Sequence, residues 1–135
     1  MYYILKIENS KKSGGTMKKI EAIIRPEKLT DTLAGLKKIG IQGFTVSQAV
    51  GRGKQKGTQG VYRGENYKVT LHPKIRLEIV LSDYMVEQTI QAIIRCAQTG
   101  EDGDGKIYVY PILEGYNIKT GKADESIDDL ANAEE

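Results

Sequence analysis

The sequence is poor in the residues that build disulfide frameworks, metal centres and membrane spans. It has one cysteine, Cys96, and one histidine, His72, in 135 residues. One cysteine cannot form a disulfide within the chain, and a lone thiol is typical of a reducing compartment. No apolar run approaches the roughly 18 residues that a membrane-spanning helix needs. The composition therefore excludes a disulfide scaffold, a His/Cys metal set and a helical membrane protein.

The chain also lacks an excess of charge of either sign. Its 20 Lys and Arg residues nearly balance its 18 Asp and Glu residues, for a net charge of +2. Any site for a polyanion must therefore be local. Cys96 shows no link to His72, and no nucleophile–base pair or carboxylate pair stands out. These absences favour a binding module over an enzyme.

We expect three regions along the chain. Residues 1–16 are an appendage of unknown purpose: the apolar part, Tyr2 to Leu5, is too short for a signal peptide, and no cleavage site follows it. Residues 17–121 form one domain, a length that suits a single core. Residues 122–135 are acidic and poor in large apolar side chains, which predicts a flexible tail.

Hydrophobic periodicity predicts an α+β fold. It indicates strands at 19–24, 44–50, 75–81 and 106–109, with Pro111 ending the last; a helix between Pro26 and Gly40; and a helix capped by Ser82 or Asp83 and closed by Gly100. The order β-α-β-β-α-β is the ferredoxin-like pattern, an antiparallel sheet with both helices on one face. The other face would be uncovered, and we expect the protein to oligomerise through it.

A long loop is predicted between the second and third strands. Residues 51–76 read GRGKQKGTQGVYRGENYKVTLHPKIR, which is far longer than a hairpin turn. The segment carries two tyrosines, Tyr62 and Tyr67, and a single acid, Glu65, against seven cations: Arg52, Lys54, Lys56, Arg63, Lys68, Lys74 and Arg76. Long polar loops in small domains are usually functional or disordered. This loop is suited to binding a partner.

Residues 99–106 nearly match a phosphate-binding P-loop. Gly100 and Gly105 bracket four residues, and Lys106 follows, but Ile107 stands where a metal-binding hydroxyl is needed. The loop also runs from helix to strand, the reverse of a Walker ATPase. Small residues still let backbone amides approach an anion, and Lys106 adds a charge. The alternative is a plain turn with a glycine helix stop.

Two weaker signals accompany this loop. Gly51-Arg-Gly-Lys-Gln55 is a second glycine-spaced cationic segment at a strand end. Glu78 lies on the polar face of the third strand, where it is either solvated or available to a purine amine. Two cationic segments of this kind in one small domain favour a nucleotide site.

With these motifs in place, the chain resembles the PII nitrogen signal-transduction proteins from about Met17 to Gly121. Tyr62-Arg-Gly-Glu-Asn-Tyr67 resembles the family's T-loop motif, residues 99–109 resemble its B-loop signature, and residues 51–57 resemble the base of the T-loop. The resemblance implies a cytoplasmic homotrimer of ferredoxin-like subunits with ATP or ADP in the clefts between them. Such a protein is not an enzyme and does not bind nucleic acid directly.

The resemblance also implies roles for individual residues. The nucleotide-binding residues would be Thr45, Gly51, Arg52, Gly53, Lys54, Glu78, Gly103, Asp104, Gly105, Lys106 and Lys119. Gln55 would help bind Mg²⁺ on ATP, where 2-oxoglutarate joins the metal, and Lys74 would pair with a 2-oxoglutarate carboxylate. Arg63 would contact a partner, an ammonium transporter or a nitrogen-metabolism enzyme or regulator, and a channel partner would bring the protein to the membrane. Tyr67 is the candidate for uridylylation.

The sequence departs from the family's pattern at three places. The family often has two arginines in its C-terminal loop that reach the neighbour's phosphates, where this chain has Asn117 and Lys119. Lysine cannot make the bidentate contact of arginine. Glu65-Asn66 replaces the usual small residue and Glu between the loop tyrosines, and residues 1–16 have no counterpart.

Two other functions fit the sequence less well. A ferredoxin-like nucleic-acid-binding module would use the basic loop for phosphate and tyrosines for stacking, but the RNA-recognition consensus needs aromatic residues on the central strands. Phe44 and Tyr108 are isolated, and the third strand has none. An ATPase lacks its base and metal-binding hydroxyl.

Overall fold

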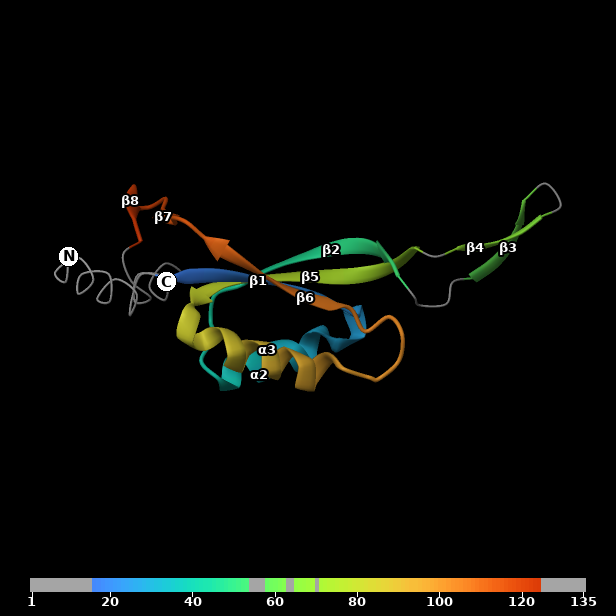
Figure 1. The fold of residues 1–135 in the computed structure, drawn as a ribbon, viewed down its shortest axis with the longest axis horizontal. Coiled ribbons are helices and arrows are strands. Elements are labelled where there is room, and N and C mark those ends of the chain that lie inside the picture. Colours follow the sequence, from blue (N-terminus) through green and yellow to red (C-terminus); the bar gives the residue numbers. More distant parts are fainter. Residues whose placement is uncertain (1–15, 54–57, 63–64, 70, 125–135) are drawn as a thin grey trace, which may run out of the picture.

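The structure is a computed structural model, and it describes residues 16–53, 58–62, 65–69 and 71–124. In chain order the elements are β1 (Met17–Ile24), the 3-10 helix η1 (Pro26–Lys28), α2 (Leu29–Lys38), β2 (Thr45–Arg52), β3 (Thr58–Tyr62), β4 (Glu65–Val69), β5 (Leu71–Ser82), α3 (Asp83–Ala97), β6 (Lys106–Ile112), β7 (Tyr116–Asn117) and β8 (Lys122–Ala123). Four strands form an antiparallel sheet in the order β2-β5-β1-β6. Both long helices lie on one side of it (Figure 1). The predicted ferredoxin-like α+β fold is confirmed.

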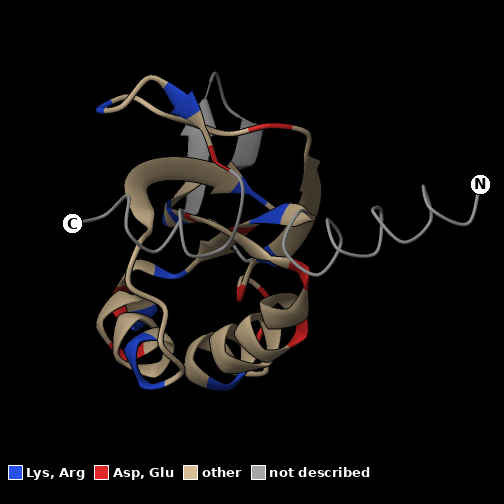
Figure 2. Cartoon of the chain, turned by 90° about the vertical axis from the view of Figure 1, so that its left-hand side faces the viewer, with Lys and Arg blue, Asp and Glu red and all other residues tan. Residues whose placement is uncertain are grey.

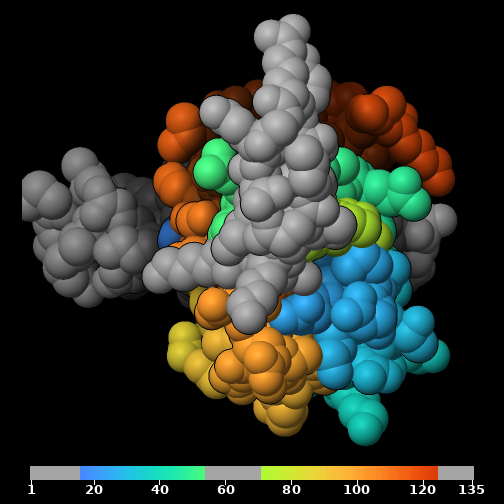
Figure 3. All heavy atoms as spheres, turned by 90° about the vertical axis from the view of Figure 1, so that its right-hand side faces the viewer, coloured from blue at the N-terminus to red at the C-terminus, as the bar shows by residue number. Residues whose placement is uncertain are grey.

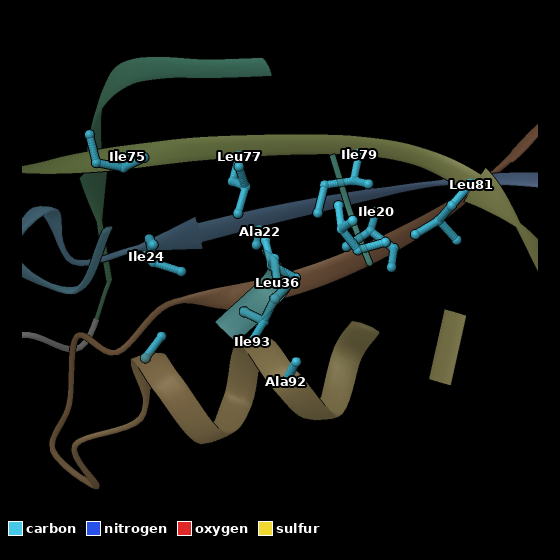
Figure 4. Close-up of a cluster of buried hydrophobic side chains, with 12 residues drawn as sticks. Ile20, Ala22, Ile24, Leu36, Ile75, Leu77, Ile79, Leu81, Ala92 and Ile93 are labelled. Atoms are coloured by element: carbon cyan, nitrogen blue, oxygen red, sulfur yellow. The ribbon is translucent and has the colours of Figure 1, made fainter. Parts of the chain in front are cut away.

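The core lies between the two central strands and the two helices. Alternate residues of β1 and β5 point toward the helices, namely Ile20, Ala22, Ile24, Ile75, Leu77, Ile79 and Leu81 (Figure 4). They pack with Leu36 of α2 and Ile93 of α3, both buried. Each fully buried side chain of this size contributes about 1.5–3 kcal/mol of transfer free energy. This packing fixes β1 and β5, whose ends carry the candidate site.

The opposite face of the sheet carries the other alternate positions, which are mainly polar and charged but include Val80, Tyr108 and Tyr110. Figure 2 looks along the strands from one end, with the helices beneath the sheet and the β7–β8 hairpin on the other side. No helix of the described chain covers this face. The predicted uncovered face is therefore present in the single chain.

The strands are longer than the sequence patterns predict. β2 continues to Arg52 and β5 begins at Leu71, because the two pair as far as Arg52↔Leu71. Pro73, which has no backbone N–H to donate, is tolerated in β5 because β1 pairs with β5 only from Ile75 onward and leaves that side of Pro73 without a partner strand among the described residues. β6 likewise runs past Pro111, which we expected to end it: the described residues pair β6 only with β1, so the missing N–H can face outward.

Other boundaries also differ from the expected ones. α3 begins after Ser82, as predicted, but ends at Ala97 rather than near Gly100. The segment predicted as one long loop contains a hairpin, in which β3 pairs with β4 from Thr58↔Val69 to Tyr62↔Glu65. Hydrophobic periodicity does not reveal such a hairpin, because its strands, TQGVY and ENYKV, are short and largely polar.

The two chain ends are only partly described. Residues 1–15 and 125–135 lie outside the described residues, so the appendage at 1–16 and the acidic tail at 122–135 stay predictions. The first two residues of that tail form β8, which pairs with β7. Within the described residues, no helix has the length and apolar character needed to cross a membrane.

Candidate anion-binding site

The loop between α3 and β6 is shaped by glycines with positive φ. Gly100, Gly103 and Gly105 have φ of +89°, +100° and +107°, values that side chains other than glycine rarely adopt. Gly105 has a second reason to be glycine. A Cβ at this position would lie 1.7 Å from the carbonyl oxygen of Ile23, at the end of β1. The loop is therefore held in backbone contact with the central strand.

Asp104 is the centre of the loop's hydrogen bonding. Its carboxylate accepts bonds from the Thr99 hydroxyl (2.5 Å), the Thr99 amide (2.8 Å) and the Gly100 amide (2.8 Å). Burial of the carboxyl opposes its ionisation, but the bonds from Thr99, Gly100 and Arg25 outweigh burial and hold the pKa of Asp104 well below its usual range. Asp104 is thus an anion that organises the loop from within.

Arg25 ties this loop to the segment that follows β1. Its Nε lies 3.0 Å from Asp104 Oδ1, and its Nη2 donates to the Asp102 carbonyl at 2.8 Å. In Figure 3 the orange atoms of the loop lie against the blue atoms of this segment. Sequence reasoning missed Arg25, because an arginine before a proline gives no signal of a partner 79 residues away.

Lys74 reaches the same loop from β5. Its Nζ donates to the Gly103 carbonyl at 2.5 Å. Gly51, on the neighbouring strand, leaves room for the lysine stem, since a Cβ there would lie 3.3 Å from Lys74 Cγ. Burial of the ammonium, together with the charge of Arg25, lowers the pKa of Lys74. The structure therefore brings Gly51, Lys74 and Gly103 together.

Glu78 and Thr45 form the other end of the candidate site. They are directly paired across β5 and β2, and Glu78 accepts a hydrogen bond from Lys19 Nζ at 3.1 Å. This bond is the main reason that the pKa of Lys19 is raised. Glu78 lies four residues from Lys74 along β5, about 13 Å at the usual strand rise. An extended ligand is needed to contact both ends.

A charge network that sequence reasoning missed lies on the same face, beside Glu78. Glu21 of β1 accepts hydrogen bonds from the Tyr110 hydroxyl at 2.6 Å and from Arg76 Nε at 3.1 Å. The Tyr110 bond, helped by Arg76, lowers the pKa of Glu21 despite the opposing effect of burial. Lys19 Nζ lies 4.7 Å from the centre of the Tyr110 ring. The alternation of charged residues on β1 and β5 was a usable signal for this network.

The remaining predicted residues are scattered or lie outside the described part. Lys106 begins β6 opposite Ile23 and is exposed, and Arg52 and Gly53 are exposed at the end of β2. Lys119 lies between β7 and β8, at the far end of the sheet from the loop (Figure 1). The predicted residues not described are Lys54, Gln55, Arg63 and the side chain of Tyr67, whose backbone lies in β4 opposite Gly60.

Asn117 has a local role in the β7–β8 hairpin. Its side-chain oxygen accepts a hydrogen bond from the Thr120 amide at 3.2 Å, and its carbonyl accepts one from Gly121 at 2.7 Å. Both bonds close the turn that presents Lys119. Asn117 therefore shapes the hairpin, whatever else the hairpin contacts.

A separate groove lies on the helix side of the sheet. Its volume is about 470 Å³, and its walls are mainly apolar, contributed by Ile90, Ile93, Ile94, Ala97, Ile107 and Val109. Asp104, Gly105 and Lys106 form only one part of the wall. An apolar groove of this kind does not suit a phosphate, so the anion site is assigned to the loop and the Lys74 side.

The chain is similar to one family along most of its length. Residues 17–122 match the family model described as "Nitrogen regulatory protein P-II". A protein of that name from Rhodospirillum rubrum is 52% identical over 106 residues, which are 78% of this chain and 95% of the relative. The Escherichia coli (strain K12) protein named P-II 1 is 46% identical over 110 residues, 82% of this chain and 98% of the relative.

A solved structure supports the same similarity. The crystal structure of Arabidopsis thaliana PII bound to citrate is 37% identical in sequence and superimposes with a TM-score of 0.66. The match covers 82% of this chain and 90% of that one. The residues outside the family match are 1–16 and 123–135.

Proposed function

Because the chain belongs to the PII family of nitrogen regulatory proteins, we propose that it senses nitrogen and energy status by binding ATP or ADP together with 2-oxoglutarate. It is a signalling protein and not an enzyme. Its output would be carried by the segment between β2 and β5, which regulates a target protein.

The observation that carries nucleotide binding is the loop at residues 99–106. Its three glycines with positive φ carry no side chain that would keep an anion from the backbone, Gly105 seats the loop on β1, and Lys106 follows it with an exposed side chain. Backbone amides and an ammonium group are the usual ligands of phosphate. The phosphates of ATP or ADP would bind here, with the base directed toward Thr45 and Glu78.

Lys74 supports a second anionic ligand. Lys74 is 8% exposed as a residue, and its ammonium lies at the edge of the loop, where a carboxylate of 2-oxoglutarate would pair with it. Mg²⁺ would be held by nucleotide phosphates and Gln55, since it is commonly bound through few protein ligands and substrate phosphates.

The uncovered sheet face supports a homotrimer. Tyr108, Tyr110 and Val80 are exposed there in the single chain, by 50%, 41% and 40%. Association through this face would cover them and bring the β7–β8 hairpin of one subunit toward a neighbour. Lys119 would then reach the neighbour's nucleotide.

The partner would be an ammonium transporter or a nitrogen-metabolism enzyme or regulator, contacted through Arg63, and the protein would be cytoplasmic. Tyr67 remains the proposed site of uridylylation. Arg63→Ala should weaken retention of an ammonium channel from native membranes and leave ADP affinity unchanged. Retention regardless of Arg63 and of the bound ligand would contradict this output.

Direct nucleic-acid binding is not supported. Tyr110, which sequence reasoning overlooked as a stacking residue, donates its hydroxyl to Glu21 and lies against Lys19. Tyr110 is thus engaged by its neighbours on the face and is not a free ring for stacking on a base. The proposal therefore keeps the small-molecule site.

Calorimetry with ATP, ADP, and MgATP plus 2-oxoglutarate tests the proposal. We expect both nucleotides to bind, and 2-oxoglutarate to bind only with MgATP. Lys106→Ala should weaken ATP and ADP alike, about tenfold for the loss of one charge-assisted contact. Binding of 2-oxoglutarate without nucleotide, or an unchanged affinity in folded Lys106→Ala, would contradict the assignment.

A further inference from the structure

We propose that Arg25 is a positioning residue of the nucleotide site: it binds the loop at residues 99–105, not the ligand, and sets where the loop's amides point. This inference rests on the proposed nucleotide binding. Two donors on one edge of the Arg25 guanidinium, Nε and Nη2, are engaged by the loop. Nε contacts Asp104 at 3.0 Å and Nη2 contacts the Asp102 carbonyl at 2.8 Å.

Arg25 is well placed to hold the loop still. Its side chain is 14% exposed and that of Asp104 is 24% exposed, so the pair is largely shielded from water. Its backbone is also restrained, because Pro26 follows it and its carbonyl accepts a hydrogen bond from the Lys28 amide at 3.0 Å. A planar guanidinium on such a base can fix two points of a loop at once.

The other bonds of Asp104 cannot replace this link. Those from Thr99 and Gly100 join residues within the loop, so they set its shape. Arg25 joins the loop to the segment after β1, so it contributes to the loop's placement on the sheet, together with the seating of Gly105 on Ile23 and the bond from Lys74 to Gly103. Affinity for a phosphate depends on donors that are already in position. Loss of Arg25 should therefore weaken binding even though the amides and Lys106 remain.

The Lys18–Asp83 pair offers a matched control. It is also an ion pair between β1 and a distant element, with Lys18 Nζ 2.6 Å from Asp83 Oδ1, but it lies at the other end of β1. Arg25→Met should weaken both ADP and ATP about tenfold, equivalent to about 1.4 kcal/mol. Lys18→Met should leave both affinities unchanged. Arg25→Lys keeps the charge but not the double contact, and should recover part of the loss.

A double-mutant cycle separates positioning from direct contact with phosphate. If Arg25 acts through Asp104, Arg25→Met should cost little further affinity in an Asp104→Asn background. If Arg25 touches the nucleotide, its effect should persist in full there, which would overturn the inference. The amide resonances of Gly100, Gly103 and Gly105 provide a second readout. Without ligand, they should shift in Arg25→Met and not in Lys18→Met.

The outcomes distinguish this inference from the proposed function. Wild-type protein that bound neither nucleotide would overturn both. Wild-type binding with normal affinity in folded Arg25→Met would overturn the inference alone. If Arg25→Met does not fold, Arg25→Lys carries the same test, and unchanged affinity together with unchanged glycine resonances would again reject the inference.

Discussion

Gly105→Ala tests how closely the loop is seated on the sheet. The alanine would have to adopt a φ of +107°, a strain that costs about 1–3 kcal/mol. Its Cβ would also lie 1.7 Å from the Ile23 carbonyl oxygen, whereas real Cβ contacts are essentially never under 3.0 Å. Ile23 belongs to a central strand and cannot retreat without disturbing its pairing. The loop must move instead, adding roughly another 1–3 kcal/mol of overpacking cost.

Gly100→Ala is the control that isolates the contact from the strain. Gly100 has a φ of +89°, but no atom lies within 4 Å of a Cβ built there. Gly105→Ala should therefore have a free energy of unfolding about 1–3 kcal/mol lower than that of Gly100→Ala. Denaturant unfolding of both variants at the same protomer concentration measures this difference. Calorimetry should show ADP weakened about tenfold or more in Gly105→Ala. Equal stabilities of the two variants would refute the close seating.

Three further predictions concern stability and assembly. Asp104→Asn should lower the free energy of unfolding at pH 7, and its difference from the wild type should narrow progressively as the pH falls below about 4, because a carboxyl with a depressed native pKa stabilises fully above its unfolded pKa and loses that stabilisation as the pH falls toward its native pKa; unfolding at a series of pH values measures this. Gly35→Ala should destabilise, since its Cβ would lie 2.5 Å from Cys96 Sγ, and adding Cys96→Ala should recover most of that loss in thermal unfolding. Sedimentation should give about three times the 15.0 kDa chain mass; a monomer would contradict the trimer.

The fold could be predicted because its signals are local. The alternating apolar residues of β1 and β5 identify the strands and the buried face, and the stripe of α3 identifies the helix side. The loop at residues 99–106 was found from its glycines and lysine. Gly105 shows the limit of that signal: the sequence indicates a turn, but only the structure shows the approach to Ile23.

The missed features depend on contacts between distant residues. Arg25 and Asp104 meet because β1 and the end of α3 converge on one end of the sheet, and spacing along the chain does not encode that. The added length of β2 and β5 was missed for another reason. Pairing at Arg52↔Leu71 uses backbone hydrogen bonds and requires no apolar pattern. Polar strands therefore look like loops in the sequence.

Asp104 raises the question of why an anion-binding loop contains an anion. Simple electrostatics predicts that Asp104→Asn should bind ADP more tightly, because one negative charge beside the phosphates is removed. The geometry predicts the opposite. The carboxylate is already matched by Arg25 and by donors from Thr99 and Gly100, so its charge is balanced, and in the proposed site Lys74 and Lys106 would supply the cations for the ligand.

An asparagine can accept bonds at only one side-chain atom, and its NH₂ would face donors that need an acceptor. The loop would lose its ionic bond to Arg25 and part of its internal bonding. ADP should therefore bind more weakly to Asp104→Asn, despite the more positive site. Calorimetry at low and moderate salt decides between the two views, since a gain from removed repulsion would shrink with added salt. Tighter binding in the variant would show that Asp104 is a repulsive charge and not the loop's anchor.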